Sequence, residues 1–216
     1  MANSLGDLMS RIIDETDRDD LGSGGALSNQ LALCIERAIE FYSDEAFWFN
    51  RAAATATTAN GSATVPLPSE IRAADTVSCN GCALRKVPVR DLEYRTESGR
   101  PSLWAMDGDA IRLWPTPDAA YPIGIYGVAR IDPPGSDGAA NAWTTEAQDL
   151  IAARTRFLLF RDVLRDGEGA QLAAQAEGEA IDRLRRETRR RAVTPLRSTG
   201  DEPWSALTTF DVNRGF

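Results

Sequence analysis

The sequence contains no histidine and only three cysteines among its 216 residues. Without histidine, the chain lacks the commonest metal ligand and the side chain that moves protons most readily near neutral pH. Ser-His-Asp, Cys-His and His-Glu-x-x-His chemistry is therefore excluded. The cysteines Cys34, Cys79 and Cys82 are too few and too unevenly spaced for a disulfide framework. We expect packing to hold the fold, with no metal, cofactor or catalytic residues, and we expect no enzyme.

Long apolar runs are also missing. No stretch approaches the roughly 20 residues that cross a bilayer as a helix, and the first residues show neither a basic region nor an uninterrupted apolar one. We expect a soluble, unsecreted chain that has no membrane partner. The few cysteines fit synthesis in a reducing cytoplasm.

The charge is acidic overall but unevenly distributed. The net charge is −8; residues 1–180 hold 16 basic and 27 acidic residues, whereas residues 181–216 hold eight and five. Because phosphate binding depends on Lys and Arg releasing counterions, the acidic body argues against wrapping nucleic acid. The two parts are expected to face different partners.

Helical periodicity occurs near both ends of the sequence. Ser4 followed by Asp7 predicts a capping box that starts a first helix over about 5–17. Three further helices are expected. The second helix begins after Gly22–Gly25 and ends near Phe47–Asn50. The third runs from a Thr144 or Thr145 cap to about Leu164, and the fourth covers about 168–190.

A period of two replaces the helical pattern in the middle of the chain. Hairpins are predicted about Asn60-Gly61, Asn80-Gly81 and Asp107-Gly108-Asp109, because these dipeptides suit turns that need positive φ. Residues 123–129 add another strand. The fold class is therefore α+β: an antiparallel helical bundle of N- and C-terminal helices (1–52 plus 142–191) with an inserted antiparallel β lobe (53–141).

Residues 192–216 predict an extended C-terminal tail, because two prolines and isolated aromatic residues show no sustained period. The rings of Trp204, Phe210 and Phe216 supply anchor area without a core of their own. Such a tail can become ordered by binding to a neighbouring subunit. The alternative, a tail that folds back on the helices of its own chain, is equally open.

Three motifs resemble reactive or metal-binding sites, and each has a simpler structural explanation. Cys79-Asn80-Gly81-Cys82 has CxxC spacing, but an Asn-Gly turn does not provide the helix start that activates a thiol. Asp17, Asp19 and Gly22 match part of a calcium loop that lacks its bidentate glutamate. Asp107 and Asp109, with a distant partner such as Glu93, are a possible hydrolase pair, although turn chemistry explains both.

The most uneven feature of the sequence is an arginine cluster at the end of the last helix. Its members are Arg183, Arg185, Arg186, Arg189, Arg190 and Arg191. A solvated helix end favours cations, but six exceed what the helix dipole requires. Arginine is favoured at interface carboxylates and phosphates. An interface with acidic protein surfaces is the better functional hypothesis, and DNA is second.

The order of these segments resembles the head-to-tail adaptor (connector) proteins of tailed phages and prophages, which also occur in phage-derived gene transfer particles. The likeness covers about residues 4–190 and rests on segments in the expected order: SLGDLMSRIIDETDRDDL, IERAIEFYSDEAFWFNRA, ANGSATVPLPSEIRAADTV, GRPSLWAMDGDAIRLWPTPDAAYPIGIYGVARI and WTTEAQDLIAARTRFLLFRDVLRD.

The resemblance implies a structural subunit of the virion neck, in a twelve-copy ring beneath the portal. The helical part would surround the channel, genome DNA would pass without sequence-specific binding, and terminal segments would reach the portal or the next neck or tail protein. The arginine cluster with Trp204, Phe210 and Phe216 is the expected portal or neighbour interface. The alternative is a β-lobed virion module that binds glycan or protein, which predicts exposed rings at Trp104, Trp114 and Tyr121.

Overall fold

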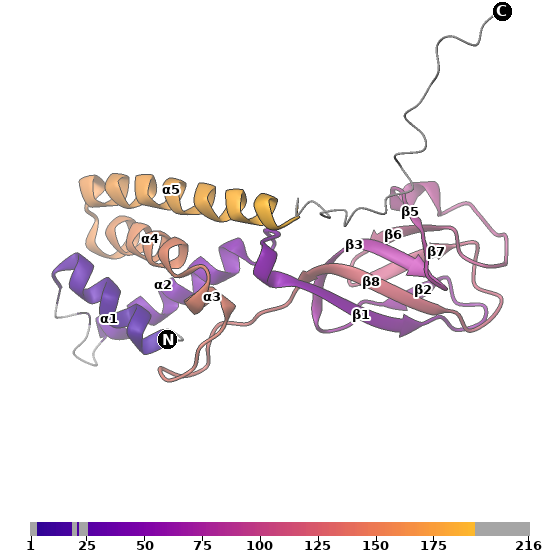
Figure 1. The fold of residues 1–216 in the computed structure, drawn as a ribbon, viewed down its shortest axis with the longest axis horizontal. Coiled ribbons are helices and arrows are strands. Elements are labelled where there is room, and N and C mark those ends of the chain that lie inside the picture. Colours follow the sequence, from indigo (N-terminus) through magenta and orange to yellow (C-terminus); the bar gives the residue numbers. More distant parts are fainter. Residues whose placement is uncertain (1–3, 19–20, 22–25, 193–216) are drawn as a thin grey trace, which may run out of the picture.

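The computed structural model describes residues 4–18, 21 and 26–192. Helices gather at one end of an elongated molecule and strands at the other (Figure 1). Helices from both ends of the sequence pack together, and the strands come from the sequence between them. The α+β prediction is therefore confirmed. The predicted tail lies outside the described residues, apart from Ala192.

Helices form the first part of the chain and its last described part. Their bounds are α1 Leu5–Thr16, α2 Ala26–Tyr42, α3 Ala142–Thr145, α4 Gln148–Leu158 and α5 Gly167–Ala192, with a π-helical turn, η4, over Leu159–Leu164. The predicted capping box starts α1: the Ser4 hydroxyl accepts a hydrogen bond from the Asp7 amide, and the Asp7 carboxylate accepts one from the Ser4 amide.

The prediction that the second helix continues to Phe47–Asn50 is wrong. The α-helix ends at Tyr42, and a 3-10 turn, η2, follows over Trp48–Asn50. The buried Asn50 side chain accepts a hydrogen bond from the Phe47 amide and donates one to the Glu45 carbonyl. These bonds satisfy backbone groups that a continued helix would have paired internally.

The predicted caps at Thr144 or Thr145 are also wrong. Asn141 caps α3, because its side-chain oxygen accepts hydrogen bonds from the Trp143 and Thr144 amides, and the Thr144 hydroxyl accepts one from the Asn141 amide. Asparagine is at least as good an N-cap as threonine. The threonines lie inside this short helix instead.

The strands form two four-stranded sheets. The strands are β1 Arg51–Thr57, β2 Thr64–Pro66, β3 Ile71–Cys79, β4 Cys82–Ala83, β5 Arg85–Lys86, β6 Leu103–Asp107, β7 Ala110–Trp114 and β8 Pro122–Ala129. The first sheet has the order β1-β8-β3-β4 and the second β2-β7-β6-β5. Neighbours are antiparallel except β5 and β6, which are parallel.

Two of the three predicted hairpins are confirmed. Asn80 and Gly81 both have positive φ and join β3 to β4, and Gly108 with φ 59° lies in the turn between β6 and β7. The hairpin about Asn60-Gly61 is wrong. Gly61 does turn the chain with φ 78°, but β1 pairs with β8 and β2 pairs with β7. The turn passes the chain between sheets.

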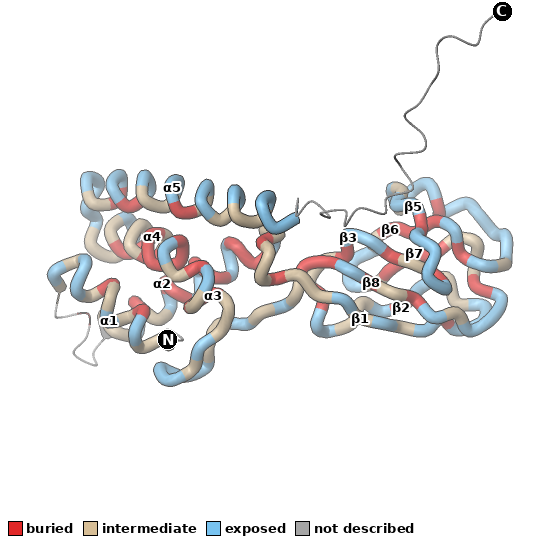
Figure 2. The backbone as a smooth tube through the Cα atoms, in the orientation of Figure 1, coloured by how far each residue is buried: buried red, intermediate tan, exposed pale blue. Residues whose placement is uncertain are grey.

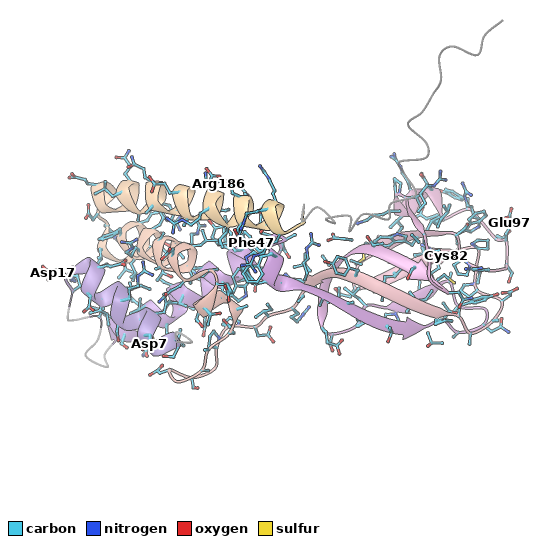
Figure 3. The ribbon with its side chains drawn as sticks, in the orientation of Figure 1. Asp7, Asp17, Phe47, Cys82, Glu97 and Arg186 are labelled. Atoms are coloured by element: carbon cyan, nitrogen blue, oxygen red, sulfur yellow. The ribbon has the colours of Figure 1, made fainter. Side chains whose placement is uncertain are left out.

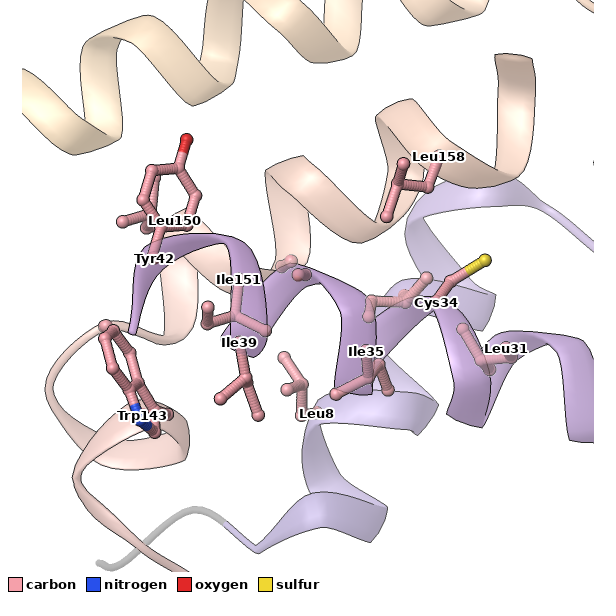
Figure 4. Packing of buried hydrophobic residues seen from close by; sticks show 14 of the residues in the cluster. Leu8, Leu31, Cys34, Ile35, Ile39, Tyr42, Trp143, Leu150, Ile151 and Leu158 are labelled. Carbon is pink, nitrogen blue, oxygen red and sulfur yellow. The ribbon is translucent and has the colours of Figure 1, made fainter. Parts of the chain in front are cut away.

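Each end of the molecule has its own apolar core. In the helical end, buried residues of α1, α2, α3 and α4 meet, including Leu8, Ile39, Trp143 and Leu150 (Figure 4). In the β lobe, Trp104, Ile111 and Ile125 lie among the buried residues between the sheets. Figure 2 shows buried residues on the facing sides of the helices, while many residues of α5 are exposed along its outer side.

Candidate functional site

The segment 43–50 connects the helical end to the β lobe, and we call it the joint. Phe47 is fully buried and meets Trp143 edge to face, while its ring stacks on Phe49. Aromatic pairs of this kind add to the stabilisation that burial provides. Figure 3 places Phe47 where the helices give way to the strands. The joint is thus anchored in the helical core.

The last turns of α5 hold the joint from the other side. Arg185 donates a hydrogen bond to Glu45 at 2.9 Å, and the Thr188 hydroxyl accepts one from the Trp48 amide at 3.2 Å. The Arg191 guanidinium lies 3.4 Å from the centre of the Trp48 ring. These contacts join residues about 140 positions apart in the sequence, so the arginine-rich end of α5 lies against the start of the β lobe.

Most of the predicted arginine cluster is paired within the chain. Arg183 binds Asp149 at 2.9 Å, and Arg190 and Arg191 both bind Glu187. Hydrogen bonds from Arg190 and Arg191 lower the pKa of Glu187 to about 2. Intramolecular ion pairs therefore account for much of the cluster.

Arg186 and Arg189 differ from the other four arginines. Both are exposed, and neither has a hydrogen-bond or ion-pair partner among the residues that the structure describes. Their places in α5 put them about 60° apart on one face of the helix, because residues three positions apart are surface neighbours. Two exposed cations thus remain available to partners.

A groove of about 440 Å³ runs between the joint and α5, and we call it the arginine groove. Its lining includes Trp48, Leu184, Glu146 and the arginines Arg183, Arg186 and Arg190. Apolar surface at Trp48 and Leu184 thus lies beside several guanidinium groups. Arginine, with its planar fork of donors, and tryptophan are the residues most enriched at protein interface hot spots.

A smaller groove of about 290 Å³ lies on the β-lobe side of Trp48. It is lined by Trp48, Arg51, Tyr126, Thr188 and Arg191, together with Ala192. The Arg51 guanidinium lies 5.7 Å from the centre of the Tyr126 ring and also binds Asp75. Trp48 and Arg191 therefore line both grooves.

The structure places the predicted interface residues differently from one another. Of the predicted interface residues, Arg183, Arg186, Arg190 and Arg191 line the arginine groove, whereas Arg185 and Arg189 do not. Trp204, Phe210 and Phe216 lie outside the described residues. The prediction missed Trp48, although three consecutive aromatic residues at 47–49 were a signal that apolar surface collects there.

Of the other chemical motifs, the Cys79–Cys82 and Asp107–Asp109 turns form no reactive centre, and Asp19 and Gly22 of the partial calcium loop lie outside the described residues. Cys79 is buried and Cys82 exposed, facing each other across the hairpin as free thiols. Asp107 and Asp109 are exposed on a turn, where Asp107 meets Arg112 at 3.4 Å. Within the described ranges, no group of three or more His, Cys, Asp or Glu is arranged to hold a metal ion.

The three β-lobe aromatics predicted to form an exposed cluster, Trp104, Trp114 and Tyr121, are not among the exposed large side chains of the described residues. Trp104 is 1% exposed within the lobe core. The Trp114 ring lies 4.5 Å beneath the Arg95 guanidinium, and the Tyr121 hydroxyl donates a hydrogen bond to Asp118. The rings at these three positions are thus committed to packing or to contacts within the chain.

Among the described residues, no helix combines the length and apolar character needed to cross a bilayer. The long α5 carries many charged residues, including the whole arginine cluster.

Comparison with known proteins identifies the class to which this architecture belongs. No curated protein matches the sequence. The model of one family, described as SU10 adaptor protein, matches residues 3–199, most of the chain. The match indicates a structural, non-enzymatic adaptor of a phage and hence a virion component that assembles with other phage structural proteins. The chain belongs to the SU10 adaptor protein family.

Proposed function

We propose that this chain is a head-to-tail adaptor of a tailed phage, which forms a ring beneath the portal and continues the DNA channel from the capsid into the tail. The resemblance noted above implies twelve copies in the ring. The observation that carries the proposal is the arginine groove, where Arg186 is exposed and has no partner in the described part of the chain, and where Trp48 lines the same groove. Membership in the adaptor family supplies the context.

We further propose that residues 1–52 and 142–191 form the ring body and that residues 53–141 form a separate lobe. The separate apolar cores at the two ends of the molecule support this division. In the ring, the helical body surrounds the channel and the genome passes without sequence-specific binding. The net charge of −8 is consistent with a wall that does not retain DNA.

The arginine groove and Arg189 are proposed to bind acidic surfaces of the portal or of a neighbouring subunit. Among the residues that the structure describes, no carboxylate binds Arg186, so a partner carboxylate can form a charge-assisted hydrogen bond without breaking an ion pair within that part of the chain. Trp48 adds apolar contact area at the same place. The tail residues Trp204, Phe210 and Phe216 are proposed to reach the same partners.

The experiment is negative-stain imaging of the full chain mixed with its portal protein. We expect closed rings stacked coaxially on the portal. The Arg186→Glu, Arg189→Glu double variant is expected to lose the stacked rings, because it places carboxylates opposite an acidic surface.

The control is Arg90→Glu, at an arginine in the β lobe whose side chain is 84% exposed and which does not line the groove. This variant is expected to assemble like the unmodified chain. If the unmodified chain stays a monodisperse monomer that ignores the portal, the proposal is wrong. If the double variant assembles normally while folding normally, the arginine groove is not the contact.

The alternative of a β-lobed binding module has little support. It predicts an exposed aromatic cluster on the β lobe, for which Trp104, Trp114 and Tyr121 are the candidates, and these three side chains are buried or engaged within the chain. A module that binds glycan by ring stacking needs open aromatic faces. We therefore keep the adaptor as the single proposed function.

A further inference from the structure

We propose that, in the free subunit, the arginine groove is occupied by the segment Asp201-Glu202-Pro203-Trp204 of the same chain. The inference concerns the subunit before assembly and does not depend on the ring or the portal. It assigns a competitor to the groove: a partner must displace the segment before it binds.

The groove offers a cation beside apolar surface. Arg186 is exposed and lacks a partner in the described part of the chain, and Arg190 and Arg183 lie in the same lining. Trp48 and Leu184 supply the apolar part. The complementary ligand is therefore a peptide with carboxylates placed next to a large apolar side chain.

The chain carries such a peptide beyond α5. Residues 193–216 contain the acidic residues Asp201, Glu202 and Asp211, and only at 201–204 do two adjacent carboxylates precede an aromatic residue closely. Pro203 restricts the preceding residue to extended conformations, which limits the entropy lost on binding. The carboxylates suit Arg186, and the Trp204 ring suits the Trp48 side of the groove.

The linker between α5 and this segment is long enough. Eight residues, 193–200, separate Ala192 from Asp201, and an extended chain of that length spans roughly 26–29 Å. Arg186 lies six residues before Ala192, about 9 Å back along the helix. Pro195 and Gly200 are residues that favour turns, as a reversal toward the groove requires.

Linker length also favours the segment of the same chain over that of a second copy. A short flexible linker produces an effective concentration in the millimolar range. A second subunit at micromolar concentration competes with this local segment at a disadvantage of about a thousandfold. The occupant is therefore intramolecular while the subunit is free.

The lysine content of the chain allows a direct test. Lys86 is the single lysine in the sequence, so Arg186→Lys introduces one new primary amine that keeps the positive charge in the groove. A zero-length carbodiimide reagent activates a carboxyl, and the amine then displaces the leaving urea to form an amide. Mass spectrometry of the full-length variant identifies which carboxyl has reacted.

We expect a cross-link from position 186 to Asp201 or Glu202, in monomers and independent of protein concentration. The matched control is Arg189→Lys, on the same helix but outside the groove lining. Its cross-link to the segment is expected to be about tenfold weaker. Adding Trp204→Ala to Arg186→Lys is expected to reduce the yield to a similar degree, a change that corresponds to about 1.4 kcal/mol of binding.

Three outcomes would overturn the proposal. The first is an Arg186→Lys variant whose new amine couples to Glu146 or Glu187 but not to the segment 201–204. The second is equal yields from Arg186→Lys and Arg189→Lys, which indicates unselective collisions. The third is a cross-link between isotopically labelled and unlabelled chains in a mixture, which assigns the groove to the tail of a second copy. None of these outcomes bears on ring formation with the portal.

Discussion

The hydroxyl of Tyr42 in α2 donates a hydrogen bond to the carboxylate of Glu177 in α5. Glu177 also accepts one from Arg154 in α4 at 3.2 Å, so a single carboxylate connects three helices. The side chains of Arg154 and Glu177 are 17% and 12% exposed. Figure 4 shows the Tyr42 ring reaching from α2 toward α5. This network fixes the last long helix, and with it the arginine groove, on the helical core.

Replacing Tyr42 by Phe is expected to destabilise the protein by roughly 1.5–3 kcal/mol, the value of a hydrogen bond to a charged group. Urea unfolding followed by circular dichroism measures the change. Tyr94→Phe is the control, because Tyr94 is 90% exposed. If both variants unfold at the same urea concentration as the unmodified chain, the Tyr42 bond contributes nothing.

The same bond predicts a loss of stability in alkaline solution. Burial, together with the Glu177 carboxylate, raises the pKa of Tyr42 above its ordinary value of 10.0. The folded protein therefore retains a proton that the unfolded chain releases above about pH 10. The contribution is fully present below that pH and is lost as the pH rises further. Between pH 9 and pH 11, the free energy of unfolding of Tyr42→Phe should fall less than that of the unmodified chain. If both proteins lose the same free energy of unfolding over this range, Tyr42 does not have a raised pKa in the folded protein.

The ion pairs of Glu187 predict a loss of stability in acidic solution. Its pKa of about 2 lies below the ordinary value of 4.5, because Arg190 and Arg191 bind the carboxylate. Its contribution is present above about pH 4.5 and is lost as the pH falls toward 2. An NMR titration of the side-chain carboxyl measures this pKa directly. Arg190→Gln combined with Arg191→Gln should raise it toward 4.5, and a value already near 4.5 in the unmodified chain would disprove the pairing.

Two glycines are expected to respond oppositely to alanine. A Cβ at Gly127 in β8 would collide with the Ala73 carbonyl oxygen of β3, which is backbone and cannot move aside. Gly127→Ala should cost about 3 kcal/mol or more. Gly178 in α5 has open space around it, so Gly178→Ala should stabilise by about 0.5–1 kcal/mol. Thermal unfolding distinguishes the two, and similar effects from both would refute the packing assigned to β3 and β8.

The joint supplies a further prediction. Asn50→Ala leaves the Phe47 amide and the Glu45 carbonyl without their partners in a buried place. We expect a loss of about 2–4 kcal/mol in urea unfolding. Asn29→Ala, at an exposed position of α2, should change stability little. A loss from Asn50→Ala no larger than that from Asn29→Ala would show that the joint does not depend on this side chain.

Local sequence determined the elements whose signals lie within a few residues of one another. The Ser4 and Asp7 capping box, the Asn80-Gly81 hairpin and the period of α5 were predictable, because caps, turns and helical faces depend on neighbouring residues. The absence of histidine likewise decided which chemistry was excluded.

Tertiary structure decided which elements meet. β1 pairs with β8 rather than with β2 because that register places its alternate residues on the lobe core, and no local turn signal encodes this choice. The arginine cluster was visible in the sequence. That Arg185 would reach Glu45 and leave Arg186 open beside Trp48 depended on packing residues about 140 positions apart. Sequence patterns report which residues prefer burial or charge, whereas their partners are selected by long-range packing of the whole chain.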